Sequence, residues 1–150
     1  MELIVDANIL ISALLKDGVT RKLLLSDEFK LYTPKFILEE FFEHIDDLAI
    51  KSNISDKVLN THIKNMIAES KIKIISKDEV RSYIQMAEQI SKDPDDVQYF
   101  ATALKMKCGI WSNDKKMKNQ SAVKIYTTAD LLEIFNNRIV FYKTTPKQER

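Results

Sequence analysis

The amino-acid sequence predicts an α/β fold, a three-layer α/β/α sandwich with a central parallel sheet. Short runs of β-branched and other apolar residues alternate with longer segments of helical periodicity, which is the pattern of strands joined by crossover helices. A length of 150 residues suffices for one compact domain and leaves little for a second. Glycine occurs only at Gly18 and Gly109, so the sequence excludes a phosphate-binding loop and a dinucleotide fingerprint.

Each strand is predicted from a short apolar run bounded by polar residues or by a helix signal. The helix after the second run is the clearest one, because an apolar stripe extends along it to about Lys51 and Pro34 suits its first turn. The five predicted strands are Glu2–Val5, Lys30–Thr33, Ile72–Ile75, Gly109–Ser112 and Val123–Tyr126.

Further helices begin at recognisable capping residues. Ser55 precedes one helix, and the segment from Ser76 to Glu79 has the spacing of a capping box before another. Asp93 and Pro94 predict a helix with proline at its first position, and Thr127 or Thr128 is expected to cap a helix over residues 129–136. The domain is therefore predicted to span residues 1–137, with residues 138–150 as an edge strand, over 139–142, or a flexible tail.

Composition and charge narrow the classes of function. The net charge is only +1, so any nucleic acid must be bound by a local basic surface rather than by the field of the whole molecule. The single cysteine, Cys108, cannot form an internal disulfide, and the two histidines, His44 and His62, lack zinc-binding spacing. No apolar run approaches the ~20 residues that span a bilayer, and without a signal segment a cytoplasmic protein is expected, with no membrane contact.

Four acids fall at the ends of predicted strands and helices. Asp6 follows the first strand, Glu40 lies in the second turn of the next helix, Asp96 starts the helix before the fourth strand, and Asp114 follows that strand. All four can face the carboxyl edge of the sheet, where such folds bind ligands. Taken alone, Asp6 is better explained as a helix N-cap. Four crowded carboxylates instead suit a divalent cation, Mg²⁺ or Mn²⁺.

The order and spacing of these segments resemble those of the PIN-domain ribonuclease family, over about residues 2–136. In that family an acidic quartet binds Mg²⁺ or Mn²⁺ and cuts RNA, and many small single-domain members are VapC-type toxins paired with an antitoxin. The resemblance thus implies that Asp6, Glu40, Asp96 and Asp114 are the catalytic and metal-binding residues. The segments that carry it are Asp6 to Ser12, Pro34 with Glu40 and Phe41, Asp93 to Leu104, and Ile110 to Lys115.

Other residues are expected to support this quartet. Ser112 would orient Asp6 or a bound water, Asn8 would extend the same polar shell, and Asp93 lies beside it, where capping the following helix is the simpler role. Lys115 and Lys116 follow Asp114 and are candidates for binding the substrate backbone, although such a charge run is often only a solvated surface.

The function predicted is metal-assisted hydrolysis of RNA phosphodiester bonds by the toxin of a type II toxin–antitoxin pair. The partners expected are the RNA substrate and an antitoxin, and the sequence leaves a homodimer open. The alternative is a catalytically silent PIN-like scaffold that binds RNA or protein. Dehalogenase-like phosphatases and receiver domains fit less well, because they require acids where this chain has Asn8 and Ser76.

Overall fold

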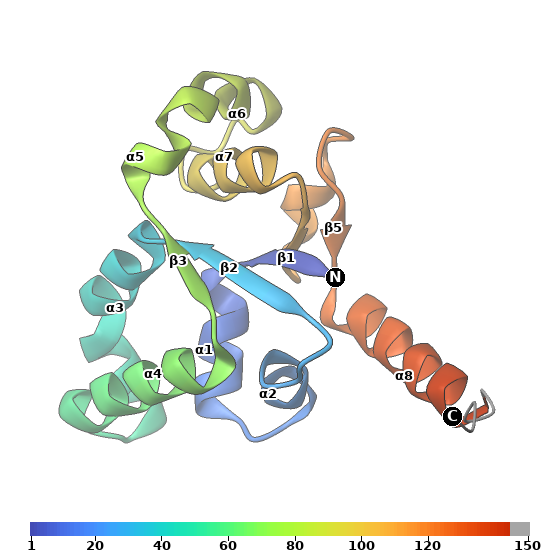
Figure 1. The fold of residues 1–150 in the computed structure, drawn as a ribbon. Coiled ribbons are helices and arrows are strands. Elements are labelled where there is room, and N and C mark those ends of the chain that lie inside the picture. Colours follow the sequence, from blue (N-terminus) through green and yellow to red (C-terminus); the bar gives the residue numbers. More distant parts are fainter. Residues whose placement is uncertain (145–150) are drawn as a thin grey trace.

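The computed structural model describes residues 1–144 and, except at His44 and residues 141–144, their side chains. Five parallel strands form one sheet in the order β3-β2-β1-β4-β5 (Figure 1). Every pair of neighbouring strands in this sheet is parallel, as the alternation of apolar runs and helices predicts. The strands are β1 (Glu2–Val5), β2 (Lys30–Pro34), β3 (Lys73–Ile75), β4 (Gly109–Trp111) and β5 (Ile125–Tyr126).

Helices cover both faces of the sheet, which gives the three layers predicted (Figure 1). On one face lie α1 (Ala7–Leu15), α2 (Val19–Leu24), α3 (Phe36–Ser52) and α4 (Asp56–Ser70). On the other lie α5 (Lys77–Val80), α6 (Ile84–Ile90) and α7 (Val97–Met106), with the short 3₁₀ helix η1 (Arg81–Tyr83) between α5 and α6. A second 3₁₀ helix, η2 (Lys115–Lys118), follows β4, and α8 (Thr128–Thr144) ends the described chain.

The connections change sides at the centre of the sheet. The chain passes from β1 to β2 and on to β3 through the α1–α4 layer, and it then returns through the α5–α7 layer to place β4 on the other side of β1. The backbone amide of Asp6, just after β1, donates to the carbonyl oxygen of Trp111 at the end of β4 (3.1 Å). The carboxyl ends of β1 and β4 therefore lie at a topological switch point, the place where α/β sheets bind ligands.

Two helix starts differ from the predictions, and a third predicted helix is divided. Pro34 ends β2 instead of lying in the first turn of α3, which begins two residues later. Residues 94–96 form a turn, so α7 begins at Val97 with Asp96 in the N-cap position. The helix that begins with the capping box of Ser76 and Glu79 is interrupted by η1. In each case a helix forms in the predicted segment, but a local turn displaces its first residue or divides it.

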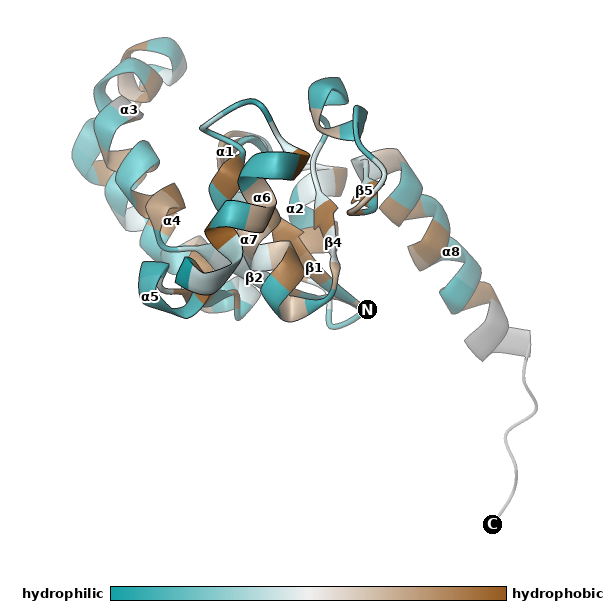
Figure 2. Cartoon of the chain, turned by 90° about the horizontal axis from the view of Figure 1, so that it is seen from above, coloured by the Kyte–Doolittle hydropathy of each residue, from teal (hydrophilic) through white to brown (hydrophobic). Residues whose placement is uncertain are grey.

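The predicted edge strand over residues 139–142 is wrong, because this segment is helical and continues α8. Thr127 and Asp130 form a reciprocal capping pair at the start of α8, with amide-to-side-chain distances of 2.9 and 3.1 Å. The helix contacts α2 and then extends away from the body of the domain (Figure 2). Residues 145–150, assigned to the flexible-tail alternative, lie outside the described residues.

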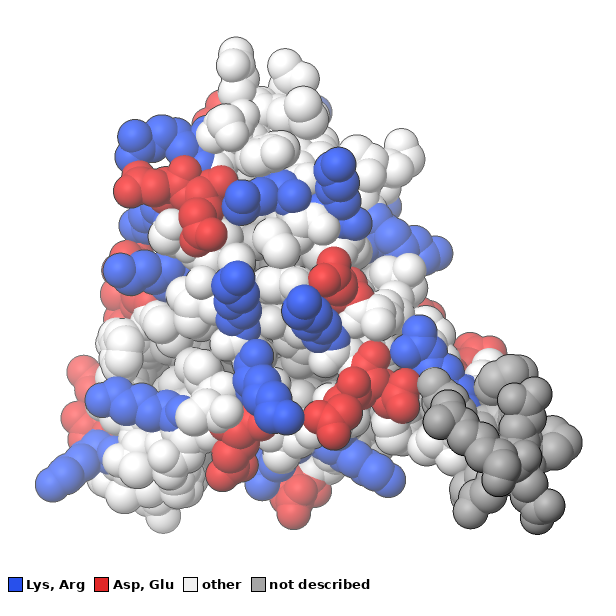
Figure 3. All heavy atoms as spheres, viewed as in Figure 1, with Lys and Arg blue, Asp and Glu red and all other residues white. Residues whose placement is uncertain are grey.

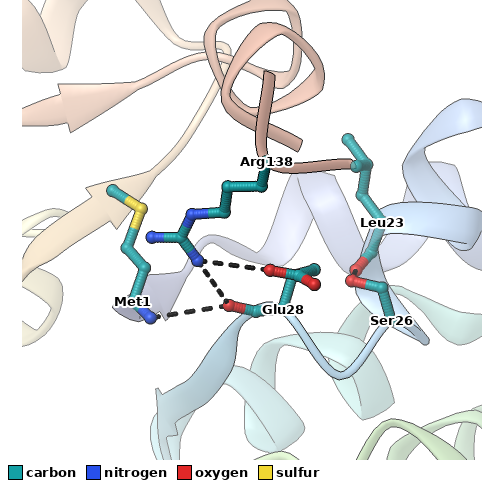
Figure 4. A network of polar contacts seen from close by, with 5 residues as sticks. All are labelled: Met1, Leu23, Ser26, Glu28 and Arg138. Carbon is teal, nitrogen blue, oxygen red and sulfur yellow. Dashed lines mark hydrogen bonds and ion pairs between the residues drawn. The ribbon is translucent and has the colours of Figure 1, made fainter. Parts of the chain in front are cut away.

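A polar network attaches α8 to the start of the chain (Figure 4). Arg138 forms an ion pair with the Glu28 carboxylate (3.3 Å) and donates to its carbonyl oxygen (3.4 Å). The amino terminus of Met1 donates to the same carbonyl (3.5 Å). The loop before β2 thus joins the amino terminus to the carboxyl-terminal helix.

The core lies between the sheet and its two helical layers, and Figure 2 shows the hydrophobic segments concentrated there. The apolar side chains of β1 and β4 are fully buried, and Trp111 is the largest of Leu3, Ile4, Val5, Ile110 and Trp111. Burial of apolar side chains of this size contributes about 1.5–3 kcal/mol each, so these central strands provide a rigid base for groups at their ends. Within residues 1–144, no helix has the length and hydropathy needed to cross a membrane.

Candidate active site at the carboxyl edge of the sheet

A cleft of about 290 Å³ opens at the switch point between β1 and β4. We call it the acidic cleft. All four acids of the predicted quartet line it, although they come from four separate parts of the chain. Its described lining contains no lysine or arginine and consists of Asp6, Ala7, Asn8, Ile11, Glu40, Phe41, Leu48, Asp93, Asp95, Asp96, Tyr99 and Asp114.

Asp6 is the most buried of the four acids, with 5% of its surface exposed. It occupies the N-cap position of α1, yet its side chain makes no capping hydrogen bond. Instead its carboxylate accepts a hydrogen bond from the hydroxyl of Ser112 (2.7 Å). Burial raises the pKa of Asp6, the Ser112 hydroxyl and the nearby Asn8 amide oppose that rise, and the charge of Asp114 adds to it. Asp6 therefore holds the N-cap position, while its side-chain hydrogen bond is made with Ser112 at the end of the neighbouring strand.

Ser112 connects Asp6 to Asp114. It is fully buried just after β4, and its hydroxyl oxygen accepts from the backbone amide of Asp114 (3.1 Å) while it donates to Asp6. The Asp114 carboxylate in turn accepts from the amide of Lys116 (2.9 Å), which caps η2. One hydroxyl thus fixes the distance between two carboxyl-bearing segments at neighbouring strand ends.

Asp96 is half-buried at the start of α7 and lies in the field of other acids. Burial, and after it the negative charges of Asp93, Asp114, Asp6 and Asp95 in that order, raise its pKa to about 6. Its side chain makes no capping hydrogen bond to α7. The acids of the cleft therefore repel one another, a repulsion that a cation would relieve.

The adjacent acids of α3 point in different directions. Glu40 is half-buried and lines the acidic cleft. Glu39 is exposed and forms an ion pair with Lys77 of α5 (3.0 Å). The sequence periodicity alone did not separate these two residues, and the structure places only Glu40 at the cleft.

Three further residues line the acidic cleft from its more exposed side. Asn8, in the first turn of α1, is exposed, and its backbone amide lowers the pKa of Asp6. Asp93 is exposed and its carboxylate accepts from the amide of Asp95 (3.0 Å), so it stabilises the turn before α7 rather than capping a helix that begins at Pro94. Asp95 is exposed and also borders the cleft.

Tyr99 is a cleft residue that the sequence did not single out. It is buried, and its hydroxyl oxygen accepts from the backbone amide of Ala7 (3.1 Å), directly after Asp6. Its ring packs edge-on against Phe36 at the start of α3, with 5.8 Å between centroids. Burial raises its pKa, and the charges of Asp6, Glu40 and Asp96 add to the rise, so it stays protonated. Its spacing of one helical turn from Asp96 was the signal in the sequence.

The two lysines predicted to bind substrate are both exposed on η2. Neither lines the acidic cleft. Lys116 borders a neighbouring hollow that shares Asp93 and Asp96 with the cleft, whereas Lys115 is not among the residues lining that hollow. The structure thus separates two neighbours that the sequence treated alike.

The donor set of the cleft fits a hard divalent cation. Carboxylate oxygens are the ligands that Mg²⁺ and Mn²⁺ prefer, and the mutual repulsion of the acids is the situation that such an ion resolves. Among the residues that the structure describes, no three acidic, histidine or cysteine side chains already stand in a ligating arrangement. Mg²⁺ retains several waters and needs only one or two direct carboxylates, so this finding does not conflict with the donor set of the cleft.

Comparisons with known proteins agree with this architecture. The model of the PIN domain family matches residues 4–136. No curated protein matches the sequence. Among solved structures, a chain of the VapBC2 complex from Rickettsia felis, solved bound to a DNA fragment from their promoter, superposes with a TM-score of 0.66. It is 13% identical, and the match covers 85% of this chain and 98% of that one, so it shows a shared fold. The match to the family model over most of the sequence shows that the chain belongs to the PIN domain family.

Proposed function

We propose that the protein is a metal-dependent endoribonuclease that hydrolyses RNA phosphodiester bonds, and that it acts as the toxin of a type II toxin–antitoxin pair. The observation that carries the proposal is the convergence of Asp6, Glu40, Asp96 and Asp114 on one cleft at the switch point of the sheet. Four acids from separate elements, without a lysine or arginine in the described lining, are costly in a protein that uses them only for stability.

Asp6, Glu40, Asp96 and Asp114 would hold the cation, Mg²⁺ or Mn²⁺. When bound, the ion would activate a water for attack and neutralise charge on the phosphate. Asp6, the most buried acid, would define the position of the site, because the Ser112 hydroxyl and the end of β1 restrict its side chain. Asp114 shares that restraint through its own amide.

The remaining cleft residues would position the acids and the substrate. Tyr99 anchors the amide of Ala7 and so holds the turn that presents Asp6. Asn8 is exposed at the cleft and offers both a donor and an acceptor to a ribose or phosphate oxygen. A cation in the cleft would lower the raised pKa of Asp96, so this acid would be ionised at neutral pH in the metal-bound protein.

The assignment as a toxin is supported by membership of the PIN domain family and by the similarity in fold to a chain of a VapBC2 complex. The structural match covers 98% of that chain. On this proposal an antitoxin protein binds the chain and suppresses cleavage. Basic and acidic side chains are mixed over the face seen in Figure 3, so a surface that binds RNA must be a local one.

The test is cleavage of a mixed-sequence single-stranded RNA by the purified chain in Mg²⁺ or Mn²⁺. EDTA should stop the reaction, and Asp6→Asn should be as inactive as the chelated protein, because it removes the acid fixed by Ser112. Asp27→Asn is the matched control, since Asp27 is exposed and pairs with Lys71 away from the acidic cleft. Activity that survives both EDTA and Asp6→Asn would exclude this site, and inactivity despite Mn²⁺ binding would favour the silent scaffold.

The toxin assignment has its own test. Induced expression in a bacterial host should arrest growth, and Asp6→Asn should relieve the arrest while Asp27→Asn should not. Growth arrest by both variants to the same extent would show that any toxicity does not come from the acidic cleft.

A further inference from the structure

A second hollow, of about 490 Å³, adjoins the acidic cleft between the turn before α7 and η2. It is lined on its polar sides by Ser91, Lys92, Asp93, Asp96, Lys116 and Asn119. Asp93 and Asp96 also line the acidic cleft, so the two cavities meet at these residues. A ligand that passes from one cavity to the other would lie across the Asp96 carboxylate.

Hydrogen bonds fix both walls of this hollow. On one side the Ser91 hydroxyl accepts from the amide of Asp93 (3.2 Å), and Asp93 holds the amides of the turn that follows. On the other side the Gln120 amide group donates to the carbonyls of Met117 (3.0 Å) and Val123 (2.8 Å). The walls are therefore built before any ligand binds, which lowers the entropy cost of binding.

The lining combines two lysines, the carboxylates of Asp93 and Asp96, and an apolar part. Lys92 and Lys116 are exposed at the hollow, and within the described part of the chain neither forms an ion pair, unlike Lys30, Lys71 and Lys77. The apolar part comes from Ile90, which is half-buried, and from the edges of Phe100 and Met117, whose exposed fractions are only 1% and 2%. A ligand that satisfies both parts carries an anionic group and a flat apolar body, and the volume lies within the range of small-ligand sites.

We infer that this hollow binds one nucleotide of the RNA strand next to the bond that is cut, with Lys92 and Lys116 on its phosphate and its base against the apolar lining. That the bound nucleotide belongs to an RNA strand rests on the proposed function. The connection through Asp93 and Asp96 places the neighbouring phosphate of the same strand at the acidic cleft. Lys92 and Lys116 act as positioning residues that set how the strand enters.

Lys115 provides a matched control for Lys116. The two lysines are adjacent on η2 and both exposed, but only Lys116 lines the hollow. Lys64, exposed on α4, controls for the loss of one positive charge elsewhere. All four lysines are exposed, so their replacement by alanine should leave the fold intact, which circular dichroism checks.

The first measurement titrates the whole ¹⁵N-labelled chain with uridine 5′-monophosphate, without metal. The amide signals of Ser91, Lys116 and Asn119 should shift, and Lys92→Ala or Lys116→Ala should raise the dissociation constant several-fold, whereas Lys115→Ala and Lys64→Ala should not. Ribose 5-phosphate should bind more weakly than the nucleotide, because it lacks the base. Binding unaffected by either Lys92→Ala or Lys116→Ala, or equal binding of ribose 5-phosphate, would overturn the inference.

The second measurement uses a single-stranded RNA oligomer with Mn²⁺. Lys92→Ala and Lys116→Ala should each raise KM, leave kcat close to that of the wild type, and lower the slope of log affinity against log salt by about 0.7. An unchanged KM in both variants, with cleavage intact, would overturn the nucleotide site and leave the proposed function standing. Absence of any metal-dependent cleavage would overturn the proposed function, while lysine-dependent nucleotide binding would still support the site.

Discussion

Ser112 donates a 2.7 Å hydrogen bond to the carboxylate of Asp6, a residue 106 positions earlier in the chain. Both residues are buried at the ends of adjacent strands, β1 and β4. Because the same hydroxyl also accepts from the amide of Asp114, it sets the geometry of two acids at once. Loss of this hydroxyl should therefore disturb both acids together.

Ser112→Ala should reduce activity about 10–100-fold, the usual cost of removing a group that orients a metal ligand. It should also raise the pKa of Asp6, because the hydrogen bond that opposes the effect of burial is lost. The pH at which activity is half-maximal should therefore move upward, which a pH profile of kcat/KM measures. Ser112→Thr keeps the hydroxyl and should recover part of the activity. Equal profiles for wild type and Ser112→Ala would show that the contact is only structural.

Glu40→Gln should reduce activity by more than the loss of about 10–100-fold that is typical of an orienting residue, because Glu40 itself lines the cleft. Glu39→Gln removes an exposed ion pair with Lys77 and should cost only about 0–1 kcal/mol of stability, with activity retained. Cleavage rates and urea denaturation of both variants separate the two effects. If Glu39→Gln were as inactive as Glu40→Gln while folded, the assignment of Glu40 as a cation ligand would be wrong.

Asp96→Asn should stabilise the metal-free protein at neutral pH. The pKa of Asp96 is raised from the ordinary aspartate value of 3.8 to about 6 in the folded chain. Between these values the folded state binds more protons than the unfolded state, so the free energy of unfolding falls as pH rises from about 4 to 6. Asparagine cannot ionise, so the variant keeps the stability that the wild type loses over this pH range. Solvent screening limits the difference in free energy of unfolding to about 1 kcal/mol, which corresponds to about 2–4 °C in Tm.

Thermal denaturation in EDTA at several pH values tests this prediction. The Tm difference between Asp96→Asn and wild type should be largest above pH 6 and vanish near pH 4. Added Mn²⁺ should reverse the order, because it stabilises wild type more than a variant that lacks one acid. A variant that is less stable than wild type at pH 7 in EDTA would contradict the proposed repulsion.

Gly109→Ala should destabilise the fold by about 1–3 kcal/mol. A Cβ atom at this position would lie 2.6 Å from the Tyr126 ring and 2.8 Å from the backbone oxygen of Lys124, where β4 and β5 pair. Gly18→Ala is the control, since its added carbon would meet only the flexible Lys16 side chain at 3.8 Å, and it should cost on the order of 0.5 kcal/mol. Similar denaturation midpoints for the two variants would refute the close packing of β5.

The strands and the acids at their ends could be predicted because both follow from local patterns. An apolar run ends at Asp6, another ends just before Asp114, and parallel strands bring such ends together. Glu40 could be chosen over Glu39 only from the family's spacing, because the apolar stripe of α3 flanks both. The structure resolves the choice, because the packing of α3 through Ile37, Phe41 and Ile45 leaves Glu40 at the acidic cleft and Glu39 exposed.

Features that depend on contacts between distant segments could not be predicted. Tyr99 was assigned to no role, because its bond to Ala7 joins α7 to α1 across 92 positions. Lys92 was likewise missed, since its place beside Lys116 arises from the packing of two loops. For residues 138–150 the sequence left an edge strand or a flexible tail open, because Ile139 and Val140 favour strands, whereas α8 continues to Thr144 and contacts Glu28 through Arg138.

The position of β4 between β1 and β5 has a consequence for synthesis of the chain. Until residues 109–114 have been made, β1 has a neighbour on only one side, and its buried side chains border an unpaired strand edge. The same late segment brings Ser112 and Asp114 to Asp6. A ribosome-bound or truncated product that stops earlier therefore lacks the assembled cleft and exposes an apolar edge, which makes it both inert and a ready substrate for proteolysis.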